Sequence, residues 1–252
     1  MQLKYVFISN AQDKASDSMD AKLCANSPQY FGTTIAHDFL QLAENEWAGG
    51  SIGREGLVRD FHILSMGCED LRNTILTAAS LPAEYQGKLH ITLNDSDTSV
   101  MARNVLFLFM LIHEEGGESL ASRIATIWYS LHISKKDYKL IQRSLQDLLK
   151  INAERFQELV GGLVIISDTD LDKIRDIWKR WYSLSCQRIE RSSINLSKKR
   201  KEWFAEQDHK FAPETQFYLE SLSEEEAISI GQWFDHGLFL PDEAKQSDLP
   251  YD

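Results

Sequence analysis

Along the middle of the chain, apolar residues occur in short runs that are separated by stretches with steps of three and four. The runs predict strands over Asp60–Met66 and Lys88–Leu93, and the helical spacing predicts helices over Asp70–Ser80 and Thr98–His113. Strands that alternate with helices of about ten residues or more favour parallel pairing through right-handed crossovers. We therefore expect an α/β core with a parallel sheet over residues 56–167.

The N-terminal segment, residues 1–55, has a weaker pattern. Leu3–Ser9 is a short apolar run that predicts a strand, and Ile35–Ala48 has the spacing of a helix. The glycine-rich stretch Gly49–Gly56 should then break the chain.

The pattern after the second core helix is mainly helical. The predicted elements are helices over Ser119–Ile133 and from Ser134, Asp168 and Ser223, and one strand over Gly161–Ser167. Ser134 is followed three residues later by Asp137, and Ser223 by Glu226, which is the spacing of a capping box. We interpret the chain as a single domain in which residues 168–252 form a mainly helical C-terminal part.

The charge balance narrows the classes of partner. A net charge of -11 disfavours a general polyanion binder, because affinity for phosphate backbones comes from clustered Lys and Arg. The stretch Lys173–Trp203 is basic, and we interpret it as a solvated helix face, with nucleic-acid or membrane contact as the alternative. We therefore expect a protein partner and neither nucleic acid nor a membrane.

The cysteines and the apolar runs indicate a compartment. Cys24, Cys68 and Cys186 lie far apart, which fits neither a disulfide framework nor a zinc ribbon and favours a reducing, intracellular setting. The N-terminus has no apolar run of signal-peptide length. Val100–Ile112 is too short to span a bilayer and contains Arg103. These observations predict a cytoplasmic protein.

The turn before the first core helix has the arrangement of a nucleotide-cofactor site. Backbone amides at a helix N-terminus are unsatisfied, and a glycine such as Gly67 lets a ligand approach them. Asp70 is placed to cap the helix, and Asp95 follows the next strand, where a carboxylate can accept bonds from ribose hydroxyls. The candidate cofactor-binding residues are Gly67, Cys68, Glu69, Asp70, Asn94 and Asp95.

Glu69 argues against a working pocket. Glycine-rich cofactor loops keep this position small, and glutamate adds bulk and a negative charge. Adenosylmethionine has a carboxylate near such a turn, and repulsion in a partly dry site is worth about 1 kcal/mol or more. That corresponds to a roughly tenfold loss of affinity.

The same part of the chain resembles a known family. It is similar to the domain of unknown function at the N-terminus of dynein axonemal assembly factor 3, which also occurs in fungal and invertebrate proteins with a MYND zinc finger. The resemblance rests on Leu64–Leu81 and Leu89–Ile112, and more loosely on residues 28–42, 124–130 and 233–241.

Members of this family have glycine-cysteine-glycine-aspartate-leucine-arginine-asparagine at the turn, and this chain departs from that order at Glu69. It keeps the family's asparagine-aspartate and arginine-asparagine pairs as Asn94 with Asp95 and Arg103 with Asn104. The resemblance implies a Rossmann-like core of the class I methyltransferase type, no established activity, and a role in the cytoplasmic assembly of dynein motors. The cysteines and histidines here do not supply the ligands of a MYND finger, and a shared fold does not establish a function.

The polar residues around the turn have two interpretations. Four of them lie on the two core helices: Arg72, Asn73, Arg103 and Asn104. They either line the edge of a ligand, with Arg72 pairing with a carboxylate or phosphate, or form a buried network in which Asp70 or Asp95 satisfies the arginines. Cys68 is either a thiol with a lowered pKa beside a helix N-terminus or a small buried side chain. His62, His90 and His113 are interpreted as packed or surface side chains, because no motif supplies the other residues of a metal or catalytic site.

Two functions from different classes remain. We expect a non-catalytic protein-interaction or assembly module that has no catalytic residue, no metal and no cofactor. The alternative is an adenosylmethionine-dependent methyltransferase, which the Gly67 turn and Asp95 favour. The missing catalytic triad does not exclude it, because positioning supplies much of the rate of methyl transfer.

Overall fold

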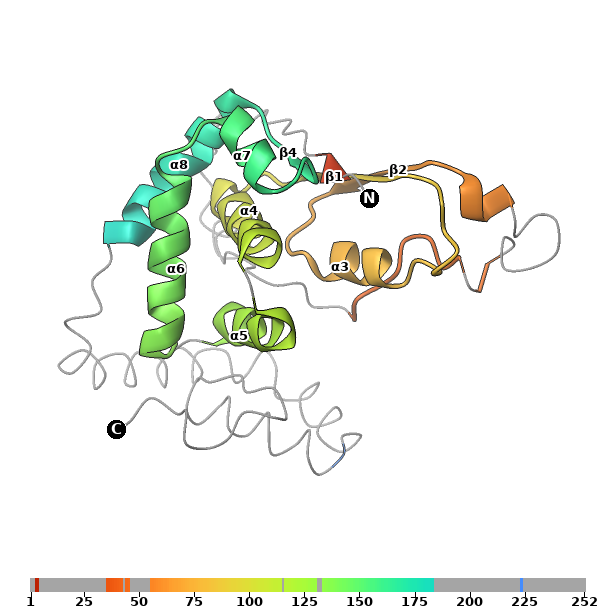
Figure 1. The fold of residues 1–252 in the computed structure, drawn as a ribbon, viewed down its shortest axis with the longest axis horizontal. Helices are drawn as coiled ribbons and strands as arrows, with labels where there is room; N and C mark the ends of the chain where they lie inside the picture. Colours follow the sequence, from red (N-terminus) through yellow and green to blue (C-terminus); the bar gives the residue numbers. More distant parts are fainter. Residues whose placement is uncertain are drawn as a thin grey trace, which may run out of the picture. The chain divides into compact units, whose positions relative to one another are not determined.

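The strands and helices of the computed structural model are labelled in Figure 1. The residues that the structure describes are 3–4, 35–42, 44–45, 55–114, 116–130, 133–183 and 223. The chain divides into two compact units, Met1–His113 with Leu145–Arg180 and Glu114–Ser144 with Trp181–Asp252.

The strands of the first unit pair in parallel. β2 (Phe61–Met66) and β3 (Leu89–Asn94) are in register from Phe61↔Leu89 to Met66↔Asn94. β1 (Leu3–Lys4) and β4 (Val164–Ile165) form a second parallel pair. The predicted parallel pairing and the mixed α/β class are confirmed, and both core strands lie within one residue of their predicted bounds.

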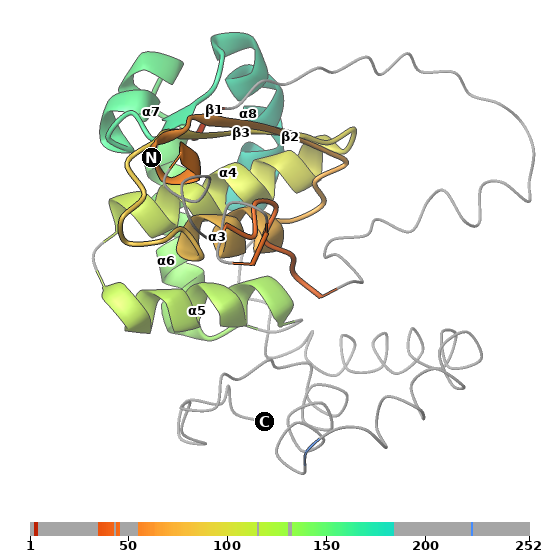
Figure 2. The same cartoon turned by 90° about the vertical axis from the view of Figure 1, so that its right-hand side faces the viewer.

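The two faces of the β2–β3 pair differ in burial. Leu89, Ile91 and Leu93 are fully buried, whereas Leu64 and Met66 are 57% and 74% exposed. This alternation follows from the two-residue period of a strand. Figure 2 shows α3 and α4 on one side of the pair.

Carboxylates lie at both ends of the same pair. At its start, Asp60 Oδ1 accepts the backbone N–H of Lys88 at 2.7 Å. At its other end, Asp95 Oδ2 accepts the backbone N–H of Glu69 at 2.9 Å. Each bond joins the chain next to one strand with the chain next to the other, so the pair is closed at both ends.

The core helices are α3 (Arg72–Ala79) and α4 (Thr98–His113). The bounds of α4 are those predicted, and Asp97 Oδ1 accepts the N–H of Ser99 in its first turn. α3 begins two residues later than predicted. Leu71 occupies its N-cap position, and the predicted cap, Asp70, accepts the N–H of Arg72 at 3.0 Å.

The bounds of the remaining labelled helices are α5 Gly117–Tyr129, α6 Lys135–Leu148, α7 Ala153–Leu159 and α8 Asp168–Ser183. α6 and α8 begin where the sequence predicts, whereas α5 begins two residues earlier than predicted and α7 has no counterpart among the predicted elements. Ser134 Oγ accepts the N–H of Asp137 at 3.1 Å, which confirms the predicted cap of α6. Ser167 and Asp170 repeat this contact at the start of α8, also at 3.1 Å.

The helix predicted over Ile35–Ala48 is wrong in its described part, where no helix forms. Asp38 Oδ1 accepts the N–H of Leu40 at 2.9 Å, and Gln41 has a φ of +45°. A side chain that bonds the backbone two residues ahead offers it an alternative to the helix. Two side chains of α3, Asn73 and Thr77, accept the backbone N–H groups of His37 and Phe39. The spacing of apolar residues within the segment gives no sign of these contacts.

Two further predictions differ from the structure at glycine-containing segments. Glu55–Val58 is helical, so the predicted break is wrong at Gly56. The strand predicted over Gly161–Ser167 shortens to β4, because Gly161 and Gly162 have φ values of +60° and +72°. The predictions for residues 5–9, 46–54, 131–132, 184–222 and 224–252, which include most of the basic stretch Lys173–Trp203, lie outside the described residues. Within the described stretches, no helix has the length and apolar character needed to cross a membrane.

Candidate functional site

The turn after β2 contains two residues in the left-handed region of backbone conformation. Gly67 has a φ of +60° and Glu69 a φ of +47°. Between them, the N–H of Cys68 donates to the carbonyl oxygen of Asn94 at 2.9 Å, which continues the β2–β3 pairing by one bond. The turn therefore stands directly beside the end of β3, as the sequence predicts.

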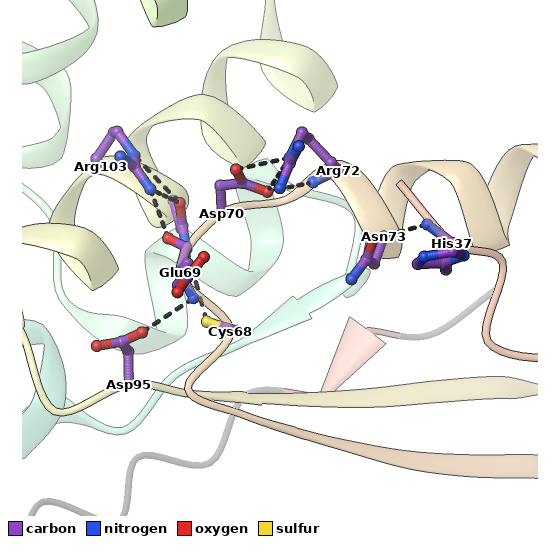
Figure 3. A network of polar contacts seen from close by, with 9 residues as sticks. His37, Cys68, Glu69, Asp70, Arg72, Asn73, Asp95 and Arg103 are labelled. Carbon is purple, nitrogen blue, oxygen red and sulfur yellow. Dashed lines mark hydrogen bonds and ion pairs between the residues drawn. The ribbon is translucent and has the colours of Figure 1, made fainter. Parts of the chain in front are cut away.

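Asp95 is engaged by the backbone on both of its oxygens. Its Oδ2 accepts the N–H of Glu69 (Figure 3), and its Oδ1 accepts the N–H of Asp97, each at 2.9 Å. Hydrogen bonds to a charged acceptor are stronger than neutral ones. The carboxylate that the sequence predicts for ribose binding therefore binds the backbone of the turn and of the residue directly before α4.

The carbonyl of Glu69 is held from the other side by α4. Arg103 Nη2 donates to this oxygen at 2.5 Å, and Asn104 Nδ2 donates to it at 3.3 Å. Arg103 Nη2 also donates to Asn104 Oδ1 at 3.1 Å, and Asn104 is fully buried. Both backbone polar groups of Glu69, its N–H and its C=O, thus have side-chain partners.

Asp70 and Arg72 form an ion pair of 2.8 Å between Asp70 Oδ2 and Arg72 Nε. The Asp70 side chain is 4% exposed and the Arg72 side chain 22% exposed. A buried carboxylate needs such a partner. The pair is the internal contact expected for Arg72, whereas Arg103 contacts Glu69 and Asn104.

Cys68 is not an activated thiol. Burial and the nearby Asp95 carboxylate raise the pKa of Cys68 to about 12, and the contact with Asn104 and the charge of Arg103 offset this only in part. The Cys68 Sγ atom lies 3.7 Å from Met101 Sδ and from Asn104 Nδ2. The interpretation with a lowered pKa is therefore wrong, because burial first and the Asp95 carboxylate second both raise the pKa of Cys68.

The outer side of Gly67 is open. A Cβ atom added to Gly67 would have no heavy atom within 4 Å, apart from its own chain neighbours. A ligand can therefore reach the backbone at this turn, which keeps the backbone of Gly67 as the most accessible part of the candidate site.

Three of the described histidines stack on other rings. His62 and His90, which are register partners in β2 and β3, stack with ring centroids 4.5 Å apart. His113 stacks on Phe109 at 4.8 Å. Among the described residues, no three His, Cys, Asp or Glu side chains are placed to hold a metal ion.

The sequence does not predict the hydrogen bonds that Asn73 and Asp97 form. Asn73 Oδ1 accepts the N–H of His37 at 2.8 Å, so this residue faces the segment before the core and is not at the turn (Figure 3). Asp97 contributes its N–H to Asp95. An aspartate directly before a helix is the only signal in the sequence that points to Asp97.

A family model described as a domain of unknown function (DUF4470) matches residues 30–133. The match includes the turn, β2, β3, α3 and α4. Neither a curated protein nor a solved structure matches this chain.

Proposed function

We propose that the chain is a non-catalytic protein-interaction module on a Rossmann-like, methyltransferase-type scaffold that does not use a cofactor. Asp95 carries the proposal. Its two oxygens each accept a backbone N–H, from Glu69 and Asp97. A ribose would have to share this carboxylate with the two backbone N–H groups that it already holds, which supports a structural role for Asp95.

The rest of the turn supports the same function. A carboxylate-bearing cofactor needs backbone N–H groups, and the amide of Glu69 is engaged by Asp95. The thiol of Cys68 stays protonated at neutral pH because its pKa is raised to about 12. The turn therefore has the features of a structural element, in which polar groups satisfy one another.

The resemblance to dynein axonemal assembly factor 3 and to the MYND-finger proteins supports an assembly role. On this proposal the module works in the cytoplasm and binds a protein partner, without nucleic acid or membrane. The match to a domain of unknown function covers the part of the chain that contains the turn.

An adenosylmethionine-dependent methyltransferase is the second candidate. The open outer side of Gly67 favours it, because a ligand can approach the backbone there without displacing a side chain. On this candidate, the six residues predicted from the sequence are the cofactor-binding set, and Glu69 is the side chain that a ligand must avoid.

Ligand binding distinguishes the two candidates. Calorimetry and thermal melting with millimolar adenosylmethionine and adenosylhomocysteine should show neither heat nor a melting shift for the wild type. Glu69→Gly removes bulk and charge, and Glu69→Gln is the matched control that removes only the charge. Binding to the wild type would refute the module, whereas binding to Glu69→Gly alone would identify Glu69 as the side chain that closes the pocket.

The interaction function needs its own test. We expect the full chain to co-purify with a defined protein under gentle conditions and to form a complex with it again from purified components. A chain that stays without a partner under these conditions would count against the module, independently of the ligand experiment.

A further inference from the structure

β2 is an edge strand among the strands that the structure describes, where β3 is its only neighbour. The N–H of Phe61 donates to the carbonyl oxygen of Lys88 at 2.8 Å, so Phe61 faces β3 with its backbone groups. In a parallel pair, residues that bond to the neighbouring strand alternate with residues that face away from it. The N–H and C=O groups of His62, Leu64 and Met66 therefore point to the outer edge of β2.

The side chains of these outward residues are also exposed. Leu64 is 57% exposed and Met66 is 74% exposed. β2 contains no Lys, Arg, Asp, Glu or proline, which are the residues that usually protect an edge strand from pairing with another chain. The outer edge of β2 therefore offers both hydrogen bonds and apolar contacts to a further strand.

β2 is complementary to a second copy of itself. A two-fold axis perpendicular to the sheet sets two such edges antiparallel. With the axis at Leu64, this residue faces Leu64 of the second copy, and His62 faces Met66 of the second copy. All three outward residues are then paired, and each pair exchanges two hydrogen bonds. An axis one residue away would set one of the three against a residue outside β2.

The charges at the two ends of β2 match in this alignment. Arg59 lies two residues before β2, and Glu69 lies three residues after it. An antiparallel pair brings the start of one β2 to the end of the other, so Arg59 of each copy approaches Glu69 of the other copy. Arg59 is exposed and Glu69 is half-buried. These opposite charges offset part of the repulsion between two chains that each have a net charge of -11.

We propose that the outer edge of β2 is a homodimer interface, in which two copies of this chain join their β2–β3 pairs into one sheet. The pair closes on itself, because each copy uses the same edge. The contact along a six-residue strand is smaller than a standard protein interface, so we expect a reversible dimer that depends on concentration. The inference stands apart from the proposed function, because it concerns the strand edge and not the Gly67 turn.

Sedimentation velocity of the full-length chain measures the dimer. Leu64→Lys sets two like charges opposite each other, so the dissociation constant of the dimer should rise roughly tenfold or more. Ile75→Lys is the matched control, because it adds the same charge at an exposed position of α3, and it should change the constant less than about twofold. Equal effects of the two substitutions would overturn the proposal. A wild type that stays monomeric up to about 1 mM, or that forms larger species, would do the same.

A cysteine at position 64 tests the alignment and does not require that Leu64→Lys folds. The Cα atoms of a hydrogen-bonded antiparallel pair lie about 5.5 Å apart, which is within the range of a disulfide. Under mild oxidation, Leu64→Cys should form an intermolecular disulfide. Ser65→Cys, whose side chain points to the other face, should not exceed the wild type, in which Cys24, Cys68 and Cys186 set the background. Equal cross-linking of the two variants would overturn the proposal.

A charge exchange tests the two ends of the strand. Arg59→Glu sets like charges together and should weaken the dimer about threefold, and adding Glu69→Lys should restore it. A double variant that binds no more tightly than the single one would overturn this alignment of the two copies. The two proposals fail separately. A monomeric wild type refutes only the dimer, whereas adenosylmethionine binding by the wild type refutes the interaction module and leaves the dimer standing.

Discussion

Asp95→Asn tests whether this side chain is a structural tie. The carboxylate accepts two backbone N–H groups, from Glu69 and Asp97. Asparagine has a single acceptor oxygen, so one of the two amides would face an NH₂ group and lose its bond. A hydrogen bond to a charged group is worth about 1.5–3 kcal/mol, and leaving a half-buried amide unsatisfied adds to the loss. We expect the free energy of unfolding to fall by about 2–4 kcal/mol.

Asp60→Asn is the matched control for this substitution. Asp60 is exposed and accepts one N–H, that of Lys88, at the opposite end of the same strand pair. An asparagine oxygen can replace that single acceptor, so we expect a loss below about 1 kcal/mol. Urea denaturation of both variants measures the two losses, and hydrogen exchange at Glu69 and Asp97 locates the first. Equal losses for the two variants would refute the tie.

Five further substitutions test other parts of the described chain. For Cys68, the folded pKa of about 12 lies above the ordinary value of 9.0, so the stability that comes from the neutral thiol is complete below pH 9 and is lost as the pH rises through 12. The wild type should lose more stability than Cys68→Ala over that range in denaturation at fixed pH values, and parallel curves would contradict the buried thiol. Gly87→Ala places a Cβ 2.0 Å from the backbone oxygen of Arg59, so we expect a loss of at least about 2 kcal/mol. The added Cβ of Gly67→Ala meets no atom, so the substitution costs only the strain of a φ of +60°, about 1 kcal/mol. Thermal melting should therefore show a larger loss for Gly87→Ala than for Gly67→Ala, and the reverse order would refute the close approach at Gly87. Trp178→Phe removes the bond from a fully buried Nε1 to the Ala102 oxygen, 2.9 Å long, and should cost about 2 kcal/mol in urea. Tyr182→Phe, at an exposed position, should change stability by less than about 0.5 kcal/mol.

The sequence predicts those elements whose signals lie within the element itself. β2, β3 and α4 were found because run length and spacing are set by burial on one face. The sequence predicts a helix at residues 35–42 because Phe39 and Leu42 have helical spacing. The real partners of this segment, Asn73 and Thr77, lie 36 and 38 residues further along the chain, and local spacing contains no information about them.

The candidate site shows the same division. Element order was enough to predict that Gly67 and Asp95 lie close together, since parallel strands bring their carboxyl ends to one edge. It did not show what Asp95 binds, because a carboxylate at this edge suits a ribose and a backbone amide equally well. The positive φ of Glu69 and the two donors on its carbonyl oxygen also depend on α4, which is distant in sequence.

The two carboxylates at the ends of the β2–β3 pair also fix how the strands align. A shift of one residue would turn Leu89, Ile91 and Leu93 outward, because neighbouring side chains in a strand point to opposite faces. The same shift would carry Lys88 away from Asp60 and Glu69 away from Asp95. A misaligned pair therefore loses its apolar contacts and the hydrogen bonds of both carboxylates at the same time.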